Sequence, residues 1–94
     1  MNAPERPRRP EDPAVIWPDG CMDSAPTWLA LFDRVRRGQW HRYTRTAFRQ
    51  EMERRASVLS GVELDLSTCD LRTFFERLES VDVCRIVGGV TADA

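Results

Sequence analysis

A block of arginines and aromatic side chains in the middle of the chain, Arg34–Arg55, holds most of the residues that could carry out molecular recognition. It contains eight arginines against two glutamates, with Trp40, His41, Tyr43 and Phe48 among them. Guanidinium groups neutralise phosphates or pair with carboxylates, and aromatic rings stack on bases or fill apolar pockets of a partner. The block therefore fits either a protein partner or a nucleic acid.

The charge of the whole chain favours a protein partner. The chain has 14 basic and 15 acidic residues and a net charge of −1, whereas nucleic-acid-binding domains are usually basic. Arginines on a helix point in several directions, and we expect part of the block to pair with acidic side chains. The candidates are Glu63, Asp65, Glu76 and Glu79. We keep nucleic-acid binding through Arg34–Arg55 as the alternative.

The predicted partner-binding site consists of Trp40, Arg42, Tyr43, Arg45 and Arg49. Most of these residues lie in or next to a segment between two predicted helices, where loop side chains are free to serve recognition. Trp, Tyr and Arg are also the side chains that dominate interface energetics. We expect this patch to dock on an acidic or apolar surface. The alternative is that Trp40 and Tyr43 are core residues that seal the gap between the helices.

The sequence offers little material for catalysis. His41 and Tyr43 are the only residues of their types. Cys69 is expected in the first turn of a helix, where the helix dipole lowers a thiol pKa, so one interpretation is a Cys69–His41 nucleophile pair. The simpler interpretation is a buried, inert cysteine. Cys21 and Cys84 complete no metal-binding spacing, and no nucleotide-binding glycine motif is present. We expect no enzymatic activity, no metal and no cofactor.

The cysteines and the hydropathy of the chain indicate a compartment. An odd number of widely spaced cysteines is typical of free thiols in a reducing cytoplasm, with one disulfide plus one free thiol as the alternative. The sequence has no apolar run of about 20 residues and no hydrophobic leader. We therefore predict a cytoplasmic protein with no membrane partner.

Three segments have the apolar periodicity of amphipathic helices. The first starts at an N-cap on Ser24 and stops at Gly38; the second runs from Thr44 or Thr46 to Gly61 as the longest helix; the third follows Ser67. We expect their apolar stripes to meet in one core. The stripe residues are Trp28, Leu31, Phe32, Val35, Phe48, Met52, Ala56, Leu59, Leu71, Phe74, Phe75 and Leu78.

Short β-strands are expected between and around these helices. Residues 14–17 and 81–87 are apolar runs bounded by turn signals, and residues 62–66 alternate apolar and acidic side chains. Residues 39–43 fit a short strand or an ordered loop. Residues 62–87 would then form a parallel, right-handed strand–helix–strand unit. The predicted fold is α+β, with three amphipathic helices packed on a short sheet; a three-helix bundle is the alternative.

The predicted domain organisation is an arm, one small domain and a tail. Residues 1–13 have proline at every third position from Pro4, which is typical of an extended, disordered arm; its P-x-x-P units would also fit an aromatic-lined groove. Residues 14–88 form the domain and residues 89–94 the tail. Trp28 is expected in the core, whereas Trp17 lies outside the helices and is a candidate for exposure.

Together these observations predict a small, non-enzymatic adaptor, inhibitor or regulator of the kind that bacteria and phages encode. The sequence also permits a subunit of a larger assembly or a homo-oligomer.

Overall fold

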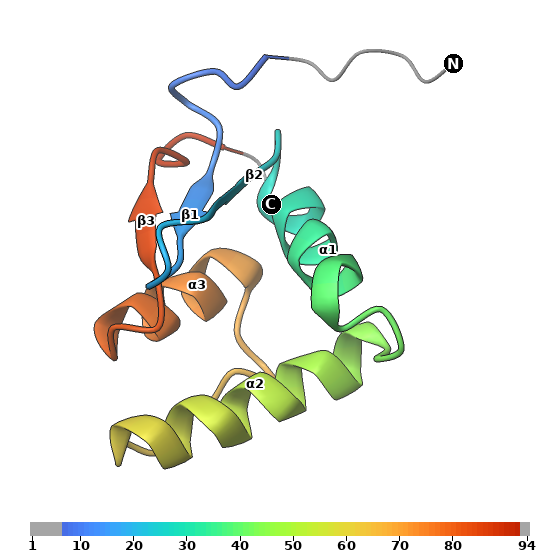
Figure 1. The fold of residues 1–94 in the computed structure, drawn as a ribbon, viewed down its shortest axis with the longest axis vertical. Coiled ribbons are helices and arrows are strands. Elements are labelled where there is room, and N and C mark those ends of the chain that lie inside the picture. Colours follow the sequence, from blue (N-terminus) through green and yellow to red (C-terminus); the bar gives the residue numbers. More distant parts are fainter. Residues whose placement is uncertain (1–6, 93–94) are drawn as a thin grey trace.

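The computed structural model describes residues 7–92 and has three helices and a three-stranded sheet, which confirms the predicted α+β fold over the three-helix bundle. The elements are β1 (Ala14–Ile16), β2 (Met22–Ser24), α1 (Trp28–Gln39), α2 (Arg45–Ser60), α3 (Leu71–Ser80) and β3 (Arg85–Val87). The helices α1 and α3 pack beside the sheet, and α2 crosses below them as a separate layer (Figure 1).

The sheet has the strand order β2-β1-β3, and both pairs are antiparallel. Strands β1 and β2 form a hairpin whose turn is closed by a 2.9 Å bond from Gly20 N–H to the Trp17 carbonyl, with Gly20 at a φ of 88°. On its other side β1 pairs with β3, so that Val15 lies opposite Ile86. The first and last strands of the chain are therefore neighbours.

The predicted strand at residues 62–66 is wrong, and so is the parallel unit built on it. This segment is a loop whose backbone N–H groups bond to side chains of α2. Leu64 N–H donates to Ser57 Oγ at 3.1 Å, and Leu66 N–H donates to Glu53 Oε2 at 3.0 Å. The alternating pattern still buries Leu66, but against a helix. Residues 40–43 form a turn, which matches the ordered-loop alternative, and Gln39 is the last residue of α1. Strand β2 was not predicted, because it is short and polar.

Helix α2 has the predicted caps, and the other two helices begin later than predicted. Thr44 Oγ1 accepts the Ala47 N–H at 3.1 Å, and Gly61 ends the helix in the left-handed conformation. The N-caps of α1 and α3 are Thr27 and Asp70. Ser24 and Ser67, predicted as these caps, instead donate to the Pro13 carbonyl and to Glu53.

The core lies where the three helices and β1 meet, and it is built around aromatic rings. Phe32 contacts Phe48 and Phe74 edge-on at 5.3 Å between ring centroids, and Phe74 packs on Phe75 at 5.1 Å. Leu59, predicted to be buried, is 84 % exposed. Leu59 lies in the last turn of α2, the helix that forms the lower layer of the molecule (Figure 1).

Both ends of the described chain contribute to packing. Asp12 and Pro13 are buried, and the Glu11 carbonyl accepts the Gly89 N–H at 3.1 Å. Gly89 is also buried, at a φ of 78°, and a Cβ there would lie 2.6 Å from the Trp28 ring. The packed structure thus begins before residue 14 and continues beyond residue 88. The part of the predicted arm at residues 1–6 lies outside the described residues.

Candidate functional site

Trp40 and Tyr43, the aromatic members of the predicted site, lie together at the junction of α1 and α2. Their rings make an edge contact at 5.6 Å, and Trp40 also packs on Phe48 at 6.1 Å. Arg36 Nη1 holds the turn by donating to the Tyr43 carbonyl at 2.9 Å. Both side chains are half-buried, so they help to seal the junction while part of each remains exposed to solvent.

Arg45 is used within the protein. Its Nε and Nη2 donate to the two carboxylate oxygens of Asp33 at 3.0 and 2.6 Å, in the bidentate geometry that gives strong ion pairs. The hydrogen bond from Arg45, together with its charge and that of Arg36, lowers the pKa of Asp33 in spite of its burial. The pair ties the start of α2 to α1.

Arg49 is also an internal contact. Its Nε donates to the Leu66 carbonyl at 2.8 Å, and its Nη2 donates to the Cys69 carbonyl. The guanidinium lies 5.8 Å from the centre of the Phe74 ring. Arg49 therefore holds the connection between α2 and α3 against the core. Arg42, in contrast, is exposed and bonds to no described residue.

The whole Arg34–Arg55 block divides in the same way, into arginines that bond within the protein and arginines that do not. Among the described residues, Arg37 and Arg42 are the only two of its eight arginines that have no bonded partner. Arg54 and Arg55 both bond to Glu51, and these hydrogen bonds lower the pKa of Glu51 to about 2. The acidic partners are thus Asp23, Asp33 and Glu51 instead of the predicted carboxylates at 63–79.

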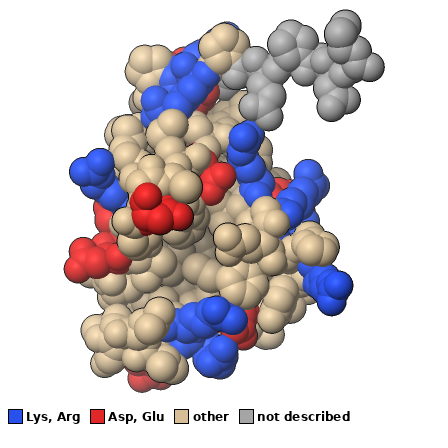
Figure 2. Space-filling model, viewed as in Figure 1, with Lys and Arg blue, Asp and Glu red and all other residues tan. Residues whose placement is uncertain are grey.

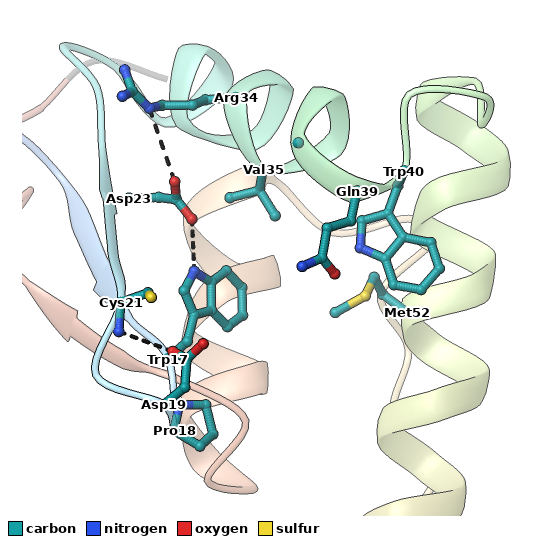
Figure 3. A pocket seen from close by; sticks show the side chains of 11 residues that line it. Trp17, Pro18, Asp19, Cys21, Asp23, Arg34, Val35, Gln39, Trp40 and Met52 are labelled. Atoms are coloured by element: carbon teal, nitrogen blue, oxygen red, sulfur yellow. Dashed lines mark hydrogen bonds and ion pairs between the residues drawn. The ribbon is translucent and has the colours of Figure 1, made fainter.

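Trp40 has a second role that the sequence did not show, because it lines a cavity of about 570 Å³ (Figure 3). Trp17, from the β1–β2 hairpin, faces Trp40 from the opposite side of this space. Val35 of α1 and Met52 of α2 supply further apolar lining, and Gln39 projects into the space from the end of α1. Three successive elements of the chain, the hairpin, α1 and α2, therefore form one site.

A second cavity of about 350 Å³ adjoins the first, since Trp17 and Pro18 line both. Its other walls include Ala56 and Leu59 of α2 and Val83 after α3. We call the two cavities together the groove. It follows the apolar stripe of α2 from Met52 to Leu59, and the visible face of the molecule is hollowed between the hairpin and α2 (Figure 2).

The polar groups around the groove hold the hairpin side in place. Asp23 Oδ2 accepts the Trp17 Nε1–H at 2.7 Å, and Asp23 Oδ1 lies 3.9 Å from Arg34 Nε. Asp19 Oδ1 accepts the Cys21 N–H at 2.9 Å. The Asp19 carboxylate raises the pKa of the Cys21 thiol, which makes this exposed cysteine a poor nucleophile at neutral pH.

The remaining chemical candidates do not converge. All three cysteines are free. Burial raises the pKa of Cys84 to about 12, and Cys69 Sγ lies near Arg49 while His41 is exposed in the turn. Within residues 7–92, no three His, Cys, Asp or Glu side chains are placed to share a metal ion. No helix in this part of the chain has the length and apolar character needed to cross a membrane.

Comparison of the chain with protein-family models, curated protein sequences and solved structures finds no match. The groove must therefore be interpreted from its own geometry. Sequence reasoning found Trp40 and named Trp17 as a candidate for exposure, but it did not bring the two together. That required the hairpin, which depends on the missed strand β2.

Proposed function

We propose that this protein is a non-enzymatic binding protein that takes an apolar segment of another protein into the groove. The observation that carries the proposal is the pair of half-buried tryptophans, Trp17 and Trp40, which face each other across an open cavity. Tryptophan is the side chain most enriched at interface hot spots, where a partner removes it from water. An adaptor, an inhibitor or a regulator would each work in this way.

The two tryptophans are held in position before any partner arrives. The indole of Trp17 is fixed by its hydrogen bond to Asp23. The indole of Trp40 is held by ring contacts with Tyr43 and Phe48 and by the guanidinium of Arg55, which lies over the ring at 4.6 Å from its centre. Because these side chains lose little freedom on binding, more of the contact energy becomes affinity.

The charges support a protein partner over a nucleic acid. A binding surface for a phosphate backbone needs several free cations, and six of the eight arginines of the block are used in contacts within the protein. The groove lining includes Asp19, Asp23 and Asp82 against Arg34, which would repel phosphates. Arg42 next to Trp40 remains available as a contact at the rim.

Site-specific photocross-linking tests the proposal. A benzoylphenylalanine in place of Gln39 would lie in the groove, whereas one in place of Gln50 would lie on the exposed face of α2 and serves as the control. In a lysate of the source organism, we expect a discrete adduct with another protein from position 39 and none from position 50. Equal labelling from both positions, or an adduct only with a second copy of the chain, would overturn the proposal.

A further inference from the structure

We infer that the segment bound in the groove is an amphipathic helix of a partner protein that carries a lysine or arginine beside Trp17 and Pro18. This inference rests on the proposed function and names the class of its ligand. Two features of the groove support it, namely its length along α2 and the charges at its hairpin side.

The length of the groove fits a helical ligand. Its α2 wall runs from Met52 to Leu59, and the seven steps between these residues correspond to about 10.5 Å at 1.5 Å per residue. Apolar residues at positions i, i+4 and i+7 of a bound helix cover the same length, as in other complexes where a helix lies in a groove. Leu59, at the end of this wall, is 84 % exposed and is therefore open to a ligand.

The structure offers a poorer binding surface to an extended ligand than to a helix. Adding a strand requires a sheet edge with free backbone groups. At the β3 edge, Ile86 N–H is already bonded to Glu79 Oε2 at 2.6 Å. The other edge strand, β2, has only three residues and packs against α1. The apolar groove along α2 is therefore the better-formed surface.

The charges at the hairpin side call for a cation on the ligand. Of the three carboxylates in the lining, Asp23 is paired with Arg34. Asp19 and Asp82 are exposed, flank the shared wall of Trp17 and Pro18, and have no basic partner among the described residues. Acidic side chains lie on the hairpin side of the hollow, and basic ones lie on the sides of α1 and α2 (Figure 2). A lysine or arginine on the ligand would complement these two carboxylates, which lack a basic partner in the described part of the chain.

Selection from a displayed library of random 16-residue peptides tests the inference. Peptides are selected on the wild-type protein after removal of those that bind Gly38→Trp, a variant designed to block the first cavity. Gly38 lines the first cavity, and a Cβ on it has no atom within 4 Å. We expect enriched peptides with apolar residues at helical spacing and a flanking lysine or arginine. Replacing that basic residue by glutamate should weaken binding about tenfold or more.

Two further measurements complete the test. The double variant Asp19→Asn, Asp82→Asn keeps the shape of both side chains, and asparagine tolerates the positive φ of 62° at position 82. It should reduce the preference for the basic peptide over the glutamate peptide at least threefold. A central proline in the peptide should abolish binding. Groove-dependent peptides that are acidic, or that tolerate the proline, would overturn this inference and leave the proposed function standing. If no selected peptide depends on the groove for binding, both this inference and the proposed function are contradicted.

Discussion

Replacing Arg49 by methionine decides whether this arginine belongs to the scaffold or to the binding surface. The side chain makes two hydrogen bonds to carbonyls of the α2–α3 connection and contacts the Phe74 ring. Hydrogen bonds from a charged group are worth about 1.5–3 kcal/mol each. Methionine keeps most of the apolar stem. Because water can reach the half-buried Cys69 segment and replace part of the loss, we expect the free energy of unfolding to fall by about 2–3 kcal/mol.

Urea denaturation followed by far-UV circular dichroism measures this change. In a domain of this size the loss corresponds to a fall in Tm of roughly 10–20 °C. Arg42→Met is the matched control, because Arg42 is exposed and unbonded; its effect should stay within about 0.5 kcal/mol. A loss for Arg49→Met no larger than that of the control would refute the assignment of Arg49 to the scaffold and restore it to the binding site.

Three other predictions concern the core, an ion pair and a chain end. Phe74→Ala should lower the free energy of unfolding by about 3–5 kcal/mol, since Phe74 is 1 % exposed; a loss below about 1 kcal/mol would contradict its central place. Because the fold lowers the pKa of Asp33, this carboxylate stabilises the folded state above a pH of about 4. That stabilisation is lost as the pH falls through the pKa of Asp33 in the folded state. Urea melts at pH 7 and pH 3 should therefore show a smaller pH dependence for Asp33→Asn than for the wild type, and equal dependence would refute the role of the pair with Arg45. Gly89→Ala should cost more stability than Gly61→Ala in thermal melts. Both glycines have a positive φ, which costs alanine about 1–2 kcal/mol of strain. Only at position 89 would the added Cβ also clash with neighbouring atoms. Equal losses would contradict the close packing there.

The helices were predictable from sequence because each carries its own local signals. Thr44 and Gly61 supply caps that need no tertiary contact, and the aromatic stripes on α1 and α3 point to one face. The sheet was less predictable, because each strand has only three residues and the pairing of β1 with β3 joins segments that are distant in the chain. Residues 62–66 show the same limit, since their backbone groups bond to Ser57 and Glu53.

The candidate site was predicted in part. Trp40 belongs both to the site predicted from the sequence and to the groove in the structure. Composition does not reveal which arginines are already paired within the fold. Arg45 and Arg49 have the residue type of an interface and the contacts of a scaffold. Leu59 fits a helical stripe, yet the end of α2 leaves it exposed. Trp17 becomes part of the groove only when the hairpin places it opposite Trp40.

The most direct test of the account is the affinity of the cross-linked partner for two variants at one position. Gly38→Ala adds a single methyl group, and Gly38→Trp adds an indole that is designed to block the first cavity of the groove. Both replace a glycine inside α1 and should keep or raise the Tm, because glycine is unfavourable in a helix. By calorimetric titration, Gly38→Ala should bind like the wild type and Gly38→Trp at least 30-fold more weakly. Equal affinity for the two folded variants would contradict the claim that the groove between Trp17 and Trp40 is the binding site.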